Sequence, residues 1–294
     1  MEQIINTRGL CKSYSNKKAV DSVDLDIRCG EIYGLLGKNG AGKTTLIKML
    51  ISLVAPTKGD IYLFGKPLKE HKNVLSNIGS VIEMPMFYYH LSARDNLGIH
   101  CRYKGIDEVQ IIKYLEMAGL YEDRDRKVKE FSLGMKQRLG IARAMLGEPQ
   151  LLILDEPING LDPEGIRDIR NLLLYLAKER STSIILSSHI LGEIESTADR
   201  VGFMNGGRLI KEMDRDLLQA AAESLFEIEV DNARTELPKL QKCLEVTGVS
   251  GNIVHIKSNA TYMELMQQLN NECIKFREVK IKRVTLEDMF MEIA

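Results

Sequence analysis

Residues 37–45 place glycines beside a lysine and two threonines in an order that suits phosphate binding. The segment fits G-x-x-x-x-G-K-[ST] and consists of Gly37, Lys38, Asn39, Gly40, Ala41, Gly42, Lys43, Thr44 and Thr45. Glycines let backbone N–H groups curl around phosphate oxygens, and a helix that begins at such a loop adds partial positive charge. Lys43 can hold the outer phosphates, and the hydroxyl of Thr44 can bind Mg²⁺. These residues predict a phosphate-binding loop.

Two acidic residues, Asp155 and Glu156, follow the apolar run 151–154. A buried strand would hold these terminal side chains rigidly near the phosphate loop. We expect Asp155 to fix Mg²⁺ through water and Glu156, which points elsewhere, to orient or deprotonate the attacking water. Such a pair on its own is at least as often an ordinary loop start. Its occurrence together with the glycine loop favours the catalytic interpretation.

A third segment, residues 131–138, has the sequence of a helix start. Ser132 is a natural N-terminal cap, and Gly134 permits close approach of another backbone. Because a helix N-terminus attracts anions, this segment predicts a second anion site.

The elements that position these motifs alternate between strands and helices. A continuous apolar run at 31–36 predicts a buried strand that enters the glycine loop. Apolar runs at 151–154 and 183–186 flank a helical stretch at 164–178, which is typical of a parallel crossover. The remaining predictions are helices at 43–53, 93–104, 108–118 and 134–146 and a hairpin of 201–204 with 208–212.

The two ends of the chain have different patterns. In the first sixty residues, Val23, Leu25 and Ile27 alternate with aspartates, which predicts an antiparallel sheet with one wet face. From about 216 onward, strands at 225–230, 253–257 and 275–281 predict a small α+β appendage. A last helix would begin with a capping box of Thr285 and Asp288. Its apolar stripe packs within its own domain or forms a docking surface, and the first is the more usual role of such a stripe.

Composition excludes several classes of protein. The 294 residues include 40 Lys and Arg against 41 Asp and Glu, so the formal charge of -1 gives no general attraction for nucleic acid. No apolar run approaches the roughly 18 residues that a membrane span needs. The five cysteines, Cys11, Cys29, Cys101, Cys243 and Cys273, are scattered, which indicates reduced thiols. The first residues lack the features of a signal peptide, so we expect a cytoplasmic protein.

The glycine loop, the serine–glycine helix start, the acidic strand and a later strand followed by His189 together resemble the ATP-binding subunit of ABC transporters. The likeness covers residues 1–214 and implies a P-loop NTPase core, an antiparallel β subdomain and an inserted helical subdomain at about 90–146. It also implies that two copies meet head to tail, with each ATP between the loop of one copy and the serine–glycine segment of the other.

Residue roles implied by this resemblance follow the motif positions. Lys43, Thr44 and Asp155 hold phosphate and Mg²⁺, and Glu156 activates water. Ser132 and Gly134 contact the γ-phosphate from the opposite copy, and His189 is the switch that touches it. The loop 159–162, which ends at Asp162, crosses the dimer interface, and Tyr14 stacks on adenine. Without the resemblance, Tyr14 would more often be a surface tyrosine and His189 a satisfied histidine.

The sequence departs from the common family pattern at several positions. Phe131, Leu133 and Met135 replace the usual leucine, glycine and glutamine of the helix start. Glu83 stands where the family normally has a glutamine that links Mg²⁺ and the attacking water to the membrane partner. This loop resembles the subgroup that exports bacitracin-like and lantibiotic peptides for immunity or resistance. The following residues 84–89 are rich in Met and aromatics and either pack inward or form a groove for a helix of the membrane subunit.

These observations predict an ATPase that powers an exporter of peptide antibiotics, with ATP and Mg²⁺ as ligands. We expect an ATP-binding domain at 1–215 and an accessory domain at 216–294. The expected partners are a second copy and a polytopic permease, which would hold the chain at the inner face of the cell membrane. The alternative is a soluble ABC-type ATPase that acts on ribosomes or DNA. Soluble ATPases of that kind usually carry two nucleotide domains in one chain or a long coiled coil, and neither is found in this sequence. A P-loop GTPase is disfavoured because no N-K-x-D motif follows the loop.

Overall fold

The computed structural model describes residues 3–15, 17–215, 224–258, 260 and 262–283. The chain divides into two compact units, residues 1–214 and 215–294.

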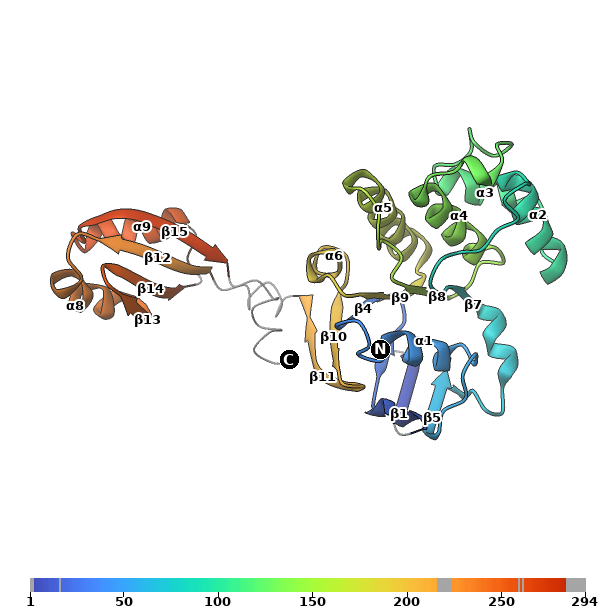
Figure 1. Cartoon of the computed structure of the whole chain (residues 1–294), viewed down its shortest axis with the longest axis horizontal. Helices are drawn as coiled ribbons and strands as arrows, with labels where there is room; N and C mark the ends of the chain where they lie inside the picture. The colour runs from blue at the N-terminus through green and yellow to red at the C-terminus, as the bar shows by residue number, and fades with distance from the viewer. Residues whose placement is uncertain (1–2, 16, 216–223, 259, 261, 284–294) are drawn as a thin grey trace. The chain divides into compact units, whose positions relative to one another are not determined.

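A six-stranded sheet forms the centre of the first unit (Figure 1). Its strand order is β11-β10-β4-β9-β8-β7, in which β10, β4, β9, β8 and β7 are parallel and β11 is antiparallel to β10. The strands are β4 (Ile32–Leu36), β7 (Ile78–Val81), β8 (Leu151–Asp155), β9 (Ser183–Ser188), β10 (Arg200–Asn205) and β11 (Arg208–Asp214). Every residue of β4, β8 and β9 is buried, as expected for parallel strands covered on both faces.

An antiparallel sheet lies beside α1 (Lys43–Leu50). Its strands are β1 (Gln3–Tyr14), β2 (Lys17–Val23), β3 (Asp26–Arg28), β5 (Lys58–Leu63) and β6 (Lys66–Pro67). One apolar cluster joins the two sheets and includes Leu46, Ile47 and Leu50 of α1. The helix that follows the glycine loop is therefore packed into the core, which fixes the position of the loop.

The alternation at 23–27 lies in an antiparallel sheet, as predicted, and is shared between β2 and β3, which both pair with β1. One sequence prediction in this region needs correction. The first helix ends at Leu50 and not at residue 53, because Ser52 adopts a left-handed conformation with φ 60°.

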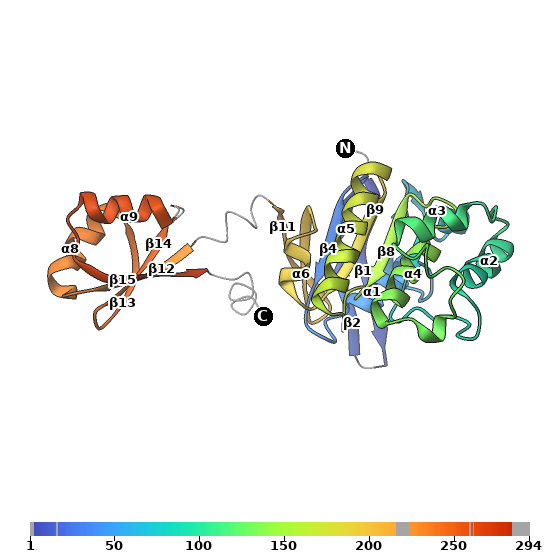
Figure 2. The same ribbon diagram turned by 90° about the horizontal axis from the view of Figure 1, so that it is seen from above.

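Three helices, of which one packs against β7, lie together at one end of the first unit (Figure 2). They are α2 (Ala93–Lys104), α3 (Gln110–Met117) and α4 (Leu133–Met145), and the short helices η1 (Lys72–Asn77) and η2 (Val128–Glu130) flank them. A capping box of Ser92 and Asp95 begins α2. The helices α5 (Pro163–Arg180) and α6 (Leu191–Glu195) pack against β9. The predicted fold class, a P-loop α/β core with antiparallel and helical parts and a C-terminal α+β appendage, is confirmed.

The second unit has the element order β-α-β-β-α-β, which is that of a split βαβ fold. Its elements are β12 (Ser224–Val230), α8 (Ala233–Cys243), β13 (Glu245–Ser250), β14 (Ile253–Ser258), α9 (Tyr262–Asn271) and β15 (Phe276–Arg283). The antiparallel sheet has the order β13-β14-β12-β15, and the helices share one core with it through Phe226, Leu240 and Leu265. The strand β13 was not predicted. The predicted last helix with Thr285 and Asp288 lies outside the described residues.

Candidate functional site

The glycine loop joins β4 to α1, as its sequence predicts. Gly42 caps α1 with φ 106°, and a Cβ at this position would collide with the carbonyl oxygen of Ala19. A side chain is therefore excluded both by conformation and by space. At the start of the loop, the N–H of Gly37 donates to the carbonyl oxygen of Ser188 at 3.2 Å, which ties the loop to the end of β9.

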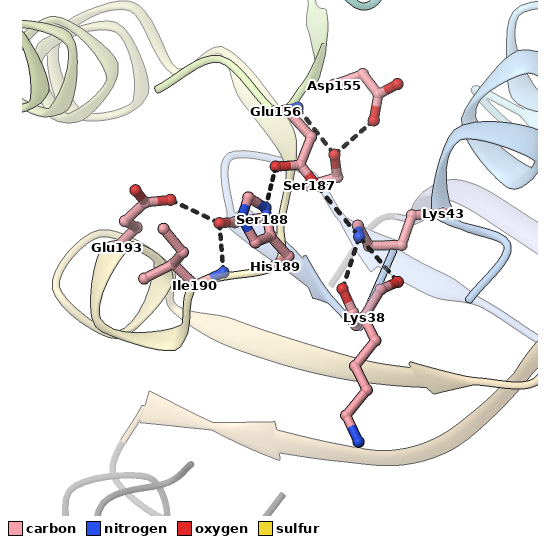
Figure 3. A network of polar contacts seen from close by, with 10 residues as sticks. Lys38, Lys43, Asp155, Glu156, Ser187, Ser188, His189, Ile190 and Glu193 are labelled. Carbon is pink, nitrogen blue, oxygen red and sulfur yellow. Dashed lines mark hydrogen bonds and ion pairs between the residues drawn. The ribbon is translucent and has the colours of Figure 1, made fainter. Parts of the chain in front are cut away.

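Lys43 is buried beneath this loop (Figure 3). Its Nζ donates to the carbonyl oxygen of Gly37 at 2.6 Å and lies 3.2 Å from Oε1 of Glu156. The side chain of Lys43 is 5% exposed. Burial of an ammonium group is costly unless it is paired, and here a carboxylate and backbone carbonyls compensate it.

The two acids at the end of β8 have different surroundings. Ser187 on β9 donates its hydroxyl to Oδ1 of Asp155 at 2.6 Å and accepts the N–H of Glu156 at 3.0 Å. Glu156 adopts a left-handed backbone with φ 51°, which turns its side chain away from that of Asp155. The expectation that the two carboxylates point in different directions agrees with this geometry.

His189 lies directly after β9 and contacts Glu156 (Figure 3). Its Nδ1 is 2.6 Å from Oε2 of Glu156, so this carboxylate bridges Lys43 and His189. The adjacent Ser188 donates its hydroxyl to Glu193 at 2.6 Å and accepts the N–H of Ile190 at 2.9 Å. Burial is the main cause that raises the pKa of Glu193 above its usual value. These contacts hold the turn that carries His189.

Glu83 follows β7 in a left-handed conformation with φ 57°. Its Oε1 lies 2.8 Å from Nζ of Lys48 on α1. The hydrogen bond with Glu83 is the main cause that raises the pKa of Lys48. Sequence reasoning singled out Glu83 but not Lys48, because the two residues are 35 positions apart and no local pattern joins them.

A cleft of about 530 Å³ brings many of the predicted residues together. Its lining includes the predicted Tyr14, Asn39, Gly40, Ala41, Gly42, Lys43, Thr44, Thr45, Glu83, Asp155 and Glu156. Lys17, Ala19, Met84, Leu133, Gln137 and Asn159 complete the lining. Tyr14 is 48% exposed, with Nζ of Lys12 5.0 Å from the centroid of its ring. An exposed aromatic ring at the edge of the cleft can stack on a nucleotide base.

Gln137 is a residue of this cleft that sequence reasoning missed. It is 3% exposed, and its Oε1 has no hydrogen-bond partner among the residues that the structure describes. The only available signal was its position one helical turn after Leu133, which also lines the cleft.

Ser132, Gly134 and Asp162 are not among the described residues that line the cleft. Ser132 caps α4 by accepting the N–H of Met135 at 3.2 Å, and Asp162 caps α5 by accepting the N–H of Gly165 at 3.2 Å. A Cβ at Gly134 would lie 3.7 Å from the side chain of Leu161, so the two helix starts are neighbours. The serine–glycine segment and the loop at 159–162 therefore share one surface.

The cleft has suitable ligands for Mg²⁺. Thr44, Asp155 and Glu83 offer hydroxyl and carboxylate oxygens, which this hard cation prefers. Within the described part of the chain, no group of three or more His, Cys, Asp or Glu side chains could hold a metal ion. A magnesium ion would therefore take several of its ligands from phosphate and water, as is usual for this cation at nucleotide sites.

A phosphate loop at the start of a core helix and a buried strand that ends in two acids, both on a parallel sheet, define the class of P-loop ATPases. The family model described as "ABC transporter" matches residues 20–159. The chain belongs to the ATP-binding proteins of ABC transporters and binds ATP as the ATPase subunit of such a transporter.

Similar proteins cover the chain to different extents. The bacitracin transport ATP-binding protein BcrA of Bacillus licheniformis is 40% identical over 100% of this chain and 98% of its own length. The lantibiotic transport ATP-binding protein SrtF of Streptococcus pyogenes is 43% identical over 72% of this chain and 92% of its own length. Among solved structures, cbiO1 from Clostridium perfringens, part of the ABC transporter complex cbiONQ, has a TM-score of 0.69. It is 28% identical and covers 75% of this chain and 92% of its own.

Proposed function

We propose that two copies of this chain bind two MgATP head to tail, hydrolyse them, and thereby power a permease that exports peptide antibiotics. The convergence of Lys43, Asp155 and Glu156 on one cleft carries the hydrolytic part of the proposal. The second anion site, at Ser132 and Gly134, is not part of that lining, although Leu133 between them is. A second copy could supply it across the cleft, together with the neighbouring loop that ends at Asp162.

The contacts of Glu156 suggest how hydrolysis is prepared. Lys43 now pairs with Glu156, and ATP would offer its phosphate oxygens as competing partners for the same ammonium group. Transfer of Lys43 to phosphate would free Oε1 of Glu156 to accept a proton from the attacking water. His189, in contact with Oε2, would hold the carboxylate in that orientation. Mg²⁺ bound near Thr44 and Asp155 would neutralise charge on the phosphates.

An apolar surface supports the proposed membrane partner. Met84, Met86, Tyr88 and Tyr103 are each more than half exposed. Hollows of about 470 and 420 Å³ share Met86 and Arg143 in their linings. Arg143 donates to the carbonyl oxygen of Met86 at 2.7 Å and lies 4.7 Å from the ring centroid of Phe87, which fixes the loop while its apolar side chains face outward. Such a surface suits a helix of a permease.

The described residues form no helix that is both long and apolar enough to span a bilayer. In this proposal the permease holds the chain at the inner face of the membrane. The peptide-antibiotic substrate is supported by the names of BcrA and SrtF, which are bacitracin and lantibiotic transport proteins. The transported peptide itself would contact the permease.

One experiment tests the partner and the substrate together. The chain is co-expressed with a candidate polytopic permease in a bacitracin-sensitive host, and growth with bacitracin or a lantibiotic is measured. We expect that the chain copurifies with the permease and that the host becomes more resistant. Tyr88→Glu should abolish both effects without loss of ATP binding. Tyr175→Glu, on the exposed part of α5, is the matched control and keeps both. Unchanged assembly of the Tyr88 variant would contradict the docking surface, and ATPase activity that responds to ribosomes or DNA instead would favour the soluble alternative.

A further inference from the structure

Lys48 and Glu83 form an ion pair at the nucleotide cleft. Lys48 lies in the last turn of α1, and its Nζ is 2.8 Å from Oε1 of Glu83 in the loop after β7. Glu83 lines the cleft together with Thr44 and Asp155. The charge of Asp155 also acts on Lys48, although less than that of Glu83. The lysine therefore lies within electrostatic range of two of the carboxylates that could face Mg²⁺.

The importance of this ion pair lies in its position at the nucleotide cleft and not in its contribution to stability. The side chains of Lys48 and Glu83 are 32% and 66% exposed, so the pair contributes little to folding stability. The pair can nevertheless affect a bound nucleotide, because Glu83 lines the cleft. A carboxylate beside a triphosphate repels it, and a lysine that pairs with this carboxylate removes most of that repulsion.

We infer that Lys48 is a positioning residue that neutralises and orients Glu83 and thereby sets how strongly nucleotide binding depends on Mg²⁺. Glu83 and Lys48 then act as one neutral unit. The carboxylate replaces the amide of the common family pattern without adding net charge to the cleft. This inference rests on the proposed binding of MgATP in the same cleft.

The test uses the full-length chain and a fluorescent N-methylanthraniloyl derivative of ATP, because the chain contains no tryptophan. The dissociation constant of this nucleotide is measured once with Mg²⁺ and once with EDTA. The ratio of the EDTA value to the Mg²⁺ value reports how strongly nucleotide binding depends on the metal. In Lys48→Met the unpaired carboxylate should weaken metal-free binding and increase this ratio by about threefold or more. In Glu83→Gln the unpaired ammonium group should decrease the ratio.

The double variant Lys48→Met/Glu83→Gln separates the inference from a structural role. If Lys48 acts through Glu83, Lys48→Met increases the ratio by a larger factor in the original chain than in the Glu83→Gln background, so the single effects are not additive. Lys48→Arg should keep the original ratio, because it retains the charge. Additive effects, or a ratio that none of the variants changes, would overturn the inference.

The chain offers a matched control in the ion pair of Lys113 and Glu148. These residues are also 35 positions apart, with side chains 34% and 58% exposed, and Glu148 has a left-handed backbone with φ 54°. Neither residue lines the cleft, so Lys113→Met and Glu148→Gln should leave the ratio unchanged. Thermal unfolding of every variant checks that the fold is retained. If the original chain binds no nucleotide under either condition, the proposed function fails. If it binds nucleotide but the effects of the two substitutions on the ratio are additive, only the role of Lys48 is contradicted.

Discussion

The carboxylate of Glu156 stands between the ammonium group of Lys43 and the imidazole of His189, at 3.2 Å from Nζ and 2.6 Å from Nδ1. One carboxylate oxygen thus contacts Lys43, which would bind phosphate, and the other contacts His189, which would also contact that phosphate. A base that is held by the phosphate-binding lysine is less available to water, so the arrangement favours proton transfer only after Lys43 has moved to a phosphate.

Replacement of Glu156 by Gln should separate binding from hydrolysis. The amide cannot accept the proton of the attacking water, and we expect ATP turnover to fall by at least about 100-fold. Loss of the carboxylate also removes its repulsion of phosphate, so the ATP-bound homodimer should accumulate. Turnover is measured by phosphate release, and the dimer by light scattering with MgATP. A variant that remains monomeric in MgATP would contradict the proposed head-to-tail sandwich.

Ser187 should be required for the geometry of both acids. Ser187→Ala removes a hydrogen bond to Asp155 and leaves the N–H of Glu156 without its acceptor, which should cost about 1–3 kcal/mol of unfolding free energy. ATP turnover should fall as well, because the two carboxylates lose their common support. The measurements are denaturant unfolding and phosphate release.

The same strand provides the control for this variant. Ser183 is equally buried at the other end of β9, where its hydroxyl accepts the N–H of Gly30 at 2.8 Å. Ser183→Ala should reduce stability by a similar amount and leave turnover nearly unchanged. If the two variants lose turnover in proportion to stability, Ser187 has only a structural role.

Much of the architecture was accessible from the sequence because its signals are local. The glycine loop, the fully apolar strands and the cap Ser132 depend on neighbours within a few residues, and they lie where the patterns predict. The strands β7 and β13 were missed, because each is short and contains a glycine, a residue that is depleted in strands. In β7, Gly79 is needed for another reason, since a Cβ there would collide with the carbonyl oxygen of Ala144.

The contacts that organise the site were less accessible. Ser187 with Asp155 and Lys48 with Glu83 are 32 and 35 residues apart, and only the finished fold brings them together. The motif predicts which residues meet the nucleotide, but it does not predict which residues hold those side chains in place. The roles assigned to Tyr14, His189, Ser132 and Gly134 stay predictions.

Gly42 and Gly40 should respond differently to alanine, although both have positive φ. Either substitution forces a left-handed alanine, at a cost of about 1–2 kcal/mol. At Gly40 a Cβ would have nothing within 4 Å, whereas at Gly42 it would collide with the backbone of Ala19. Gly42→Ala should therefore distort the loop and greatly weaken ATP binding, and Gly40→Ala should weaken it much less. Equal affinity of both variants in a binding titration would show that loop conformation matters more than space.

His100 on α2 should make the first unit sensitive to acid. Burial, with smaller contributions from Lys104 and Arg143, lowers the pKa of His100 to about 4. Its Nε2 is buried and has no hydrogen-bond partner among the described residues. Between pH 6.5 and about 4 the unfolded chain therefore binds a proton at this residue that the folded chain does not, so folding stability falls as the pH falls through this range. His100→Gln removes the titrating group, and the difference in melting temperature between pH 7 and pH 4.5 should be smaller in the variant than in the original chain. Equal pH dependence of the two proteins in thermal unfolding would show that His100 does not stay neutral in the fold.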